Sequence, residues 1–154
     1  MNLLTASGWG DRYTALAKHV STWSKDPSTQ VGAVVVGEHG QILTQGYNGF
    51  PRGIKDSDDR LNDRERKYEL VVHAEMNAIY NASLTGVSLK DSIMYVYGLP
   101  ICNECAKAIV QVGIQKVVAT RPKEWNKAWD ESTRLAKALF EEAEIIYLIE
   151  VEDE

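Results

Sequence analysis

Two cysteines in the second half of the chain have the spacing of a metal-binding pair. Cys102 and Cys105 are the only cysteines in the sequence. We predict that they lie at the start of a helix, where residues three apart project to one side and the helix dipole favours thiolate over thiol. Two such thiolates provide half of a zinc site. A redox role is the alternative, but a thioredoxin-like C-x-x-C follows a first strand, whereas three predicted strands precede this one.

His73 is the predicted third ligand, and Glu75 follows it by two residues. A lone histidine is more often an ordinary core or surface residue. The nearby Glu75 favours a ligand role for His73, because at the first turn of a helix the side chains of His73 and Glu75 can reach one point. Three protein ligands leave the fourth tetrahedral position of zinc open, and the pKa of water bound there falls to about 7. Glu75 would then move a proton between that water and a substrate, which a structural zinc site does not need.

These residues together have the signature of the zinc-dependent nucleobase deaminases, H-x-E followed by C-x-x-C. The sequence resembles the deoxycytidylate (dCMP) deaminases, which have the cytidine deaminase-like fold. The resemblance extends over most of the chain and rests on the segments 24–33, 46–49, 73–79 and 102–107, with Pro51 and Gly53. The first two of these segments, which include D-P-S-T-Q-V-G-A and G-Y-N-G, are the most specific to the dCMP branch.

The resemblance implies hydrolysis of dCMP to dUMP and ammonia, a reaction that supplies dUMP for thymidylate synthesis. It implies one catalytic Zn²⁺ per subunit on His73, Cys102 and Cys105, and attack by the activated water at C4 of cytosine. Glu75 would be the catalytic residue that protonates N3 and then the leaving amine. The implied substrate-binding residues are Ser24, Asp26, Asn48 and Ala74, and those near a phosphate or regulatory nucleotide are Gly49, Arg52 and Gly53.

The resemblance also implies an assembly and its regulation. Family members are often hexamers that dCTP activates and dTTP inhibits together with Mg²⁺, so a homo-oligomer with these effectors is expected. The sequence departs from the family at one point. A proline usually stands immediately before the first cysteine of the pair, whereas here Ile101 separates Pro100 from Cys102. This change keeps the ligands but alters the loop beside the base pocket.

The elements that must position these residues alternate between helices and strands. Hydrophobic periodicity predicts helices over residues 9–24, 73–84, 103–112 and 124–142, and strands over 31–36, 41–45, 93–97, 116–120 and 145–149. Residues 46–67 are rich in glycine, proline and charge, and we predict a long loop of the kind that forms a lid or binding loop. The order predicts an α/β fold, a three-layer α/β/α sandwich around a mixed five-stranded sheet.

Length and charge narrow the remaining possibilities. The 154 residues suffice for a single domain, predicted over 1–154, and the absence of a long apolar run or signal-like N-terminus predicts a cytoplasmic protein without membrane contact. The net charge is −5, but seven of the 22 acidic residues lie in the segment 141–154, so the first 140 residues carry +2. This weak charge argues against a nucleic-acid partner. Deamination of another cytosine nucleoside or nucleotide, a base or tRNA adenosine remains an alternative, as does a non-catalytic zinc-binding module.

Overall fold

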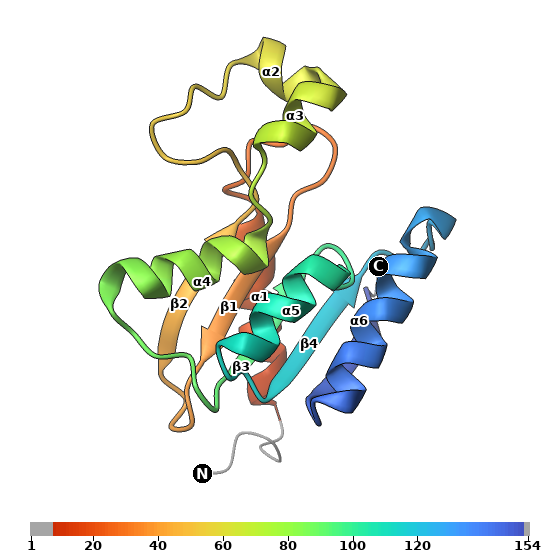
Figure 1. Ribbon diagram of the computed structural model, residues 1–154. Helices are drawn as coiled ribbons and strands as arrows, with labels where there is room; N and C mark the ends of the chain where they lie inside the picture. The colour runs from red at the N-terminus through yellow and green to blue at the C-terminus, as the bar shows by residue number, and fades with distance from the viewer. Residues whose placement is uncertain (1–7, 153–154) are drawn as a thin grey trace.

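A mixed five-stranded sheet forms the centre of the computed structural model, which describes residues 8–152 (Figure 1). The strand order is β2-β1-β3-β4-β5. β1 pairs antiparallel with both β2 and β3, whereas β3, β4 and β5 run parallel to one another. The bounds are β1 Gly32–Val36, β2 Ile42–Tyr47, β3 Ile93–Tyr97, β4 Lys116–Arg121 and β5 Ile146–Val151.

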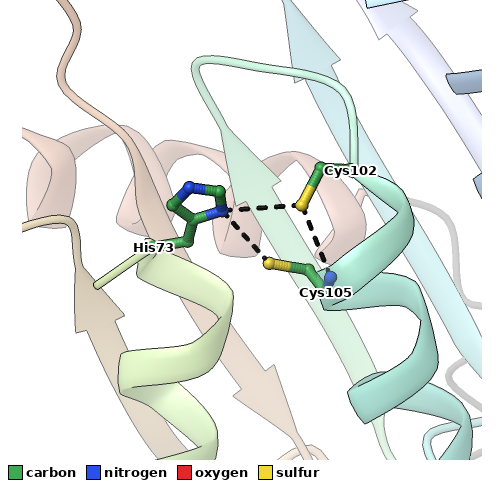
Figure 2. A group of neighbouring side chains, drawn as sticks. All are labelled: His73, Cys102 and Cys105. Carbon is green, nitrogen blue, oxygen red and sulfur yellow. Dashed lines mark hydrogen bonds between the residues drawn. The ribbon is translucent and has the colours of Figure 1, made fainter. Parts of the chain in front are cut away.

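Helices cover both faces of this sheet, which confirms the predicted three-layer α/β/α sandwich. Helix α1 (Trp9–Ser21) packs on one face, against the central strands β1 and β3. Three helices pack on the opposite face: α4 (Ala74–Thr85), α5 (Asn103–Gln111) and α6 (Asp130–Glu142). The N-termini of α4 and α5 lie close together at one end of the sheet (Figures 1 and 2).

The central strand β1 contributes side chains to the cores on both faces of the sheet. All five of its residues are buried, as the continuous β-branched run predicts for a strand covered on both sides. Val34 and Val36 pack with Val20 of α1, whereas Ala33 and Val35 belong to the core beneath α4, α5 and α6. Alternating side chains of one strand therefore supply both cores.

Helix α4 lies unusually close to β2, and Gly46 makes this possible. A Cβ atom added to Gly46 would lie 2.3 Å from the backbone nitrogen of Ala78. Two side-chain hydrogen bonds hold the same contact: the Thr44 hydroxyl donates to the Ala78 carbonyl at 2.8 Å, and the Asn81 amide donates to the Gln45 carbonyl at 2.7 Å. Because α4 carries Glu75 in its first turn, these contacts fix that residue relative to the sheet.

The prediction of a continuous loop over residues 46–67 was wrong for its second half. This part of the chain forms α2 (Asp58–Asn62) and α3 (Arg64–Leu70), which extend beyond the end of the sheet (Figure 1). The Asp63 side chain caps α3 by accepting a hydrogen bond from the Arg66 backbone N–H. Helices of five and seven residues are too short to show a clear hydrophobic period, and charged side chains dominate both of them.

The predicted bounds of two longer helices also need correction. Helix α6 begins at Asp130 rather than at residue 124, because a short 3₁₀ turn, η1 (Lys127–Trp129), precedes it. The Asn126 side chain caps that turn through the Ala128 N–H. Helix α1 ends at Ser21, three residues earlier than predicted. Among residues 8–152, no helix combines the length and apolar character that spanning a membrane requires.

Candidate metal centre and active site

His73, Cys102 and Cys105 come together between the N-termini of α4 and α5 (Figure 2). His73 is the N-cap residue of α4 and Cys102 is the N-cap residue of α5. The His73 Nδ1 atom lies 3.5 Å from the Cys102 sulfur and 3.4 Å from the Cys105 sulfur. A tetrahedral zinc with ordinary bond lengths separates a nitrogen and a sulfur ligand by about 3.6 Å. The three side chains therefore fit a zinc ion with one coordination position left open.

The thiols differ sharply in acidity. Hydrogen bonds from Cys105 and the neighbouring His73 lower the pKa of Cys102 to about 4, despite partial burial. The pKa of Cys105 lies far above its ordinary value, because its thiol donates to Cys102 and is itself buried. The hydrogen bond to Cys102 raises the pKa of His73. A metal ion that binds all three must displace the proton of Cys105, so metal binding and pH are coupled.

Glu75 lies beside the cluster in the first turn of α4 and is only 5% exposed. Burial raises the pKa of Glu75 to about 7, and the negative charge of Cys102 acts in the same direction. A carboxyl group with this pKa exists in both protonation states near neutral pH. It is therefore suited to accept a proton and to return it in the same reaction cycle.

A pocket of about 570 Å³ opens directly onto His73, Cys102 and Glu75. Its walls come from the segment 26–31, the end of β2, the α2–α3 arm, the loop before Cys102 and the turn η1. A cavity of this size is in the range of small-molecule binding sites. Residues that line it and bear on its chemistry are Asp26, Asn48, Arg64, Lys67, Tyr68, Ala74, Leu99, Pro100 and Trp129.

Of the residues that the family resemblance implies for substrate binding, Asn48 and Ala74 line this pocket, whereas Ser24 does not. The Asn48 side chain accepts from the Val31 N–H at 2.9 Å and donates to the Thr29 carbonyl at 2.9 Å. It thereby joins the end of β2 to the pocket wall. The buried Ser24 hydroxyl donates to the Asn48 carbonyl at 2.8 Å and supports the wall from behind.

Asp26 lines the pocket as well, and its carboxylate is heavily bonded. It accepts from the N–H groups of Ser28 at 2.8 Å and Thr29 at 3.1 Å. It also pairs with Lys67 of α3, whose Nζ lies 3.2 Å away, and both side chains are only 9% exposed. This buried ion pair connects the α2–α3 arm to the loop that carries Asp26.

The three residues predicted near a phosphate or regulator do not reach the main pocket. Arg52 instead donates a hydrogen bond to the Asn81 side chain, and Gly53 lies in open space. Gly49 lines a second cavity of about 160 Å³, which shares Asp26, Asn48 and Lys67 with the main pocket.

The sequence-based prediction of the site did not select Arg64, Lys67 or Trp129, although all three line the pocket. Arg64 and Lys67 lie on α3, a helix that was not predicted, and Trp129 lies in the turn η1, within a segment predicted as the start of a longer helix. Their positions depend on how the arm and η1 fold over the site. The run of charges over 51–67 was the one available signal, and it does not distinguish pocket residues from solvated ones.

A His-Cys-Cys cluster with an open position and a buried carboxyl beside it, in a pocket at the end of an α/β/α sandwich, defines a zinc-dependent hydrolase. Comparison with known proteins specifies its type. The chain belongs to the cytidine and deoxycytidylate deaminases: the profile of their zinc-binding region matches residues 7–121. The family is thus the one that the sequence resembles.

Relatives and solved structures agree with this assignment. Human deoxycytidylate deaminase is 41% identical over 146 residues, which cover 90% of this chain and 78% of that protein. A deaminase of Aliivibrio fischeri is 40% identical over 138 residues, with 89% and 90% covered. The structure of dCMP deaminase from cyanophage S-TIM5 in complex with dCMP and dUMP has a TM-score of 0.74 at 24% identity, over 94% of this chain and 98% of that one. This last likeness confirms the fold.

Proposed function

We propose that this protein hydrolyses dCMP to dUMP and ammonia with one zinc ion held by His73, Cys102 and Cys105. The observation that carries the proposal is a single pocket lined by His73, Cys102 and Glu75 and also by two cationic side chains of the arm, Arg64 and Lys67. When bound, zinc supplies the Lewis acidity that activates a water molecule at neutral pH. The deoxycytidylate deaminases among the relatives support dCMP as the substrate.

Glu75 performs the proton transfers in this proposal. Its carboxylate accepts a proton from the attacking water and donates it to N3 of the cytosine ring. The same carboxylate then accepts the remaining proton of that oxygen and donates it to the departing amine, which leaves as ammonia while the C4 carbonyl forms. The pKa of about 7 makes both directions accessible without a large free-energy change. Glu75 lies in the first turn of α4, and the preceding residue, Ala74, also lines the pocket.

Arg64 is the residue that we expect to bind the 5′-phosphate. Both Arg64 and Lys67 line the pocket, but the charge of Lys67 is already paired with Asp26. Among the described residues, no carboxylate forms an ion pair with Arg64, whose guanidinium lies over the Tyr68 ring at 5.4 Å. A planar guanidinium binds phosphate oxygens through two parallel hydrogen bonds.

Ammonia release from zinc-loaded protein tests the proposed reaction. Incubation with dCMP, deoxycytidine, dCTP and a tRNA substrate separates the possible substrates, and we expect dCMP to give the highest kcat/KM. No turnover of dCMP by protein shown to contain one zinc per chain would reject the proposal. Glu75→Gln should lower kcat by at least about 100-fold and leave zinc bound. Near-normal turnover by that variant would reject the role of Glu75.

The phosphate assignment has its own comparison. Arg64→Gln should raise KM for dCMP by about tenfold and leave the kinetics with deoxycytidine unchanged, because the nucleoside has no phosphate. Arg66→Gln is the matched control, since Arg66 is exposed on the same helix and does not line the pocket. Equal effects of the two substitutions would show that Arg64 contributes only general charge.

We further propose regulation by dCTP and by dTTP with Mg²⁺ in a cytoplasmic homo-oligomer, as the family resemblance implies. The second cavity supports a regulatory role for Gly49, because it shares a wall with the main pocket. A sigmoidal dCMP curve that dCTP makes hyperbolic is the expected result. A response to neither nucleotide would reject this part of the proposal, and light scattering would measure the oligomer.

A further inference from the structure

Tyr147 of β5 reaches across the fold to the residue before the first cysteine ligand. The Ile101 backbone N–H donates a hydrogen bond to the Tyr147 hydroxyl at 2.9 Å. The two residues are 46 positions apart in the sequence. Ile101 is fully buried, and it immediately precedes Cys102, the N-cap residue of α5.

The Tyr147 ring is itself held firmly. Its backbone pairs in register with Val117 of the neighbouring strand β4. The ring packs edge-to-face against the fully buried Phe140 of α6, with 4.9 Å between ring centroids. Because the Tyr147 ring is fixed on two sides, its hydroxyl lies at a defined point, and the hydrogen bond can hold the Ile101 backbone in place.

The Ile101 N–H needs such a partner because of where it lies. A buried backbone donor without a partner costs about 1–3 kcal/mol, so the loop from Gly98 to Ile101 would shift to satisfy it if the hydroxyl were absent. That loop supplies Leu99 and Pro100 to the pocket wall and leads directly into a metal ligand. A displacement of the ligand by even a fraction of an ångström weakens a tetrahedral site.

Burial raises the pKa of Tyr147, and the negative charges of Glu75 and Cys102 raise it further. The hydroxyl therefore keeps its proton at neutral pH and accepts from Ile101 as a neutral group.

We propose that Tyr147 is a positioning residue of the metal centre: its hydroxyl fixes Ile101, and through it Cys102 and the adjoining pocket wall, in the geometry that zinc binding and turnover require. The kinetic part of this inference rests on the proposed deaminase function, whereas the metal-binding part does not. A second bond acts on the other side of the ligand, since the Asn103 N–H donates to the Ser132 hydroxyl at 3.0 Å. Cys102 thus lies between two anchored backbone groups.

Tyr147→Phe removes the hydroxyl and keeps the ring, and Tyr13→Phe is the matched control. The Tyr13 hydroxyl also makes one partly buried bond to the backbone, donating to the Gly40 carbonyl at 2.9 Å, but on the α1 face of the sheet. Zinc affinity is measured by competition with a chromophoric chelator, and the ligand field by the absorption of cobalt-substituted protein. Urea unfolding of both variants measures the loss of stability.

We expect Tyr147→Phe to weaken zinc binding about tenfold, change the cobalt spectrum and lower kcat for dCMP about tenfold. Tyr13→Phe should lose similar stability and leave all three readouts unchanged. Unchanged zinc affinity and cobalt spectrum in Tyr147→Phe would overturn the inference and leave Tyr147 a structural residue. If neither the wild type nor the variants deaminate dCMP, the proposed function fails, and the zinc and cobalt measurements still decide the role of Tyr147.

Discussion

The buried ion pair between Lys67 and Asp26 is the contact whose loss should most disturb the pocket wall. Lys67→Met removes the cation and keeps the length of the side chain. The Asp26 carboxylate then remains at 9% exposure with only the Ser28 and Thr29 N–H groups as partners. Removing one partner of a buried pair costs about 3–5 kcal/mol, and the two remaining N–H bonds favour the lower figure, about 3 kcal/mol. For a chain of this length that corresponds to a fall in Tm of about 6–12 °C.

A second ion pair between the same two regions provides the control. Lys25 and Asp56 lie 3.1 Å apart, nearly the same distance, but their side chains are 69% and 42% exposed. Lys25→Met should therefore cost less than about 1 kcal/mol. Both variants are compared with the wild type by thermal and urea unfolding at one protein concentration, because assembly of subunits would shift Tm. An equal, small loss in Lys67→Met and Lys25→Met would refute the argument that burial gives the Lys67 pair its weight.

Three further perturbations follow from the same structure. Gly46→Ala should lower the free energy of unfolding by at least about 1–3 kcal/mol and reduce the zinc content of purified protein, because the new methyl group would push α4 away from β2. Gly49→Ala, where a Cβ atom has open space around it, should change neither stability nor zinc content, and equal effects of the two substitutions would contradict this packing argument. Removal of zinc by a chelator should lower Tm, and Zn²⁺ but not Mg²⁺ should restore it; an identical Tm with and without chelator would show that the metal does not stabilise the fold. Burial and the hydrogen bond to Glu152 raise the pKa of Tyr97 to about 12. The unfolded chain loses this proton near pH 10 while the folded chain keeps it, so the free energy of unfolding should fall between about pH 10 and pH 12. The fall should be less steep in Tyr97→Phe, and equal slopes of unfolding free energy against pH, measured by urea unfolding, would contradict this.

The metal centre was predictable because its information is local. Cys102 and Cys105 are three residues apart at a helix start, and His73 and Glu75 share the first turn of another helix. Each pair fixes its own relative geometry through helix periodicity alone. Only the meeting of the two pairs required the fold, and the alternation of strands and helices was sufficient to predict that.

The rest of the site depends on contacts between distant segments. Arg64 and Lys67 enter the pocket because two short helices fold over it, and neither helix has enough residues to show a period. Arg52, which the sequence favoured as a phosphate ligand, lies close to those helices in the chain but bonds to Asn81 of α4 instead. The Tyr147 hydroxyl accepts a hydrogen bond from Ile101, a residue 46 positions away in the sequence. No spacing rule applied to one segment could have connected these residues.

At this end of the fold the pKa values of two acidic groups shift in opposite directions, because hydrogen bonds dominate at Cys102 and burial dominates at Glu75. Cys102 caps α5 and accepts hydrogen bonds from Cys105, so the thiolate is favoured and its pKa falls to about 4. Glu75 also lies at a helix N-terminus, which by itself would favour the carboxylate. Its burial and the negative charge of Cys102 outweigh that effect and raise its pKa to about 7. Cys102 is therefore a thiolate that can bind a cation. Its negative charge helps to raise the pKa of Glu75, so Glu75 can exchange a proton at neutral pH.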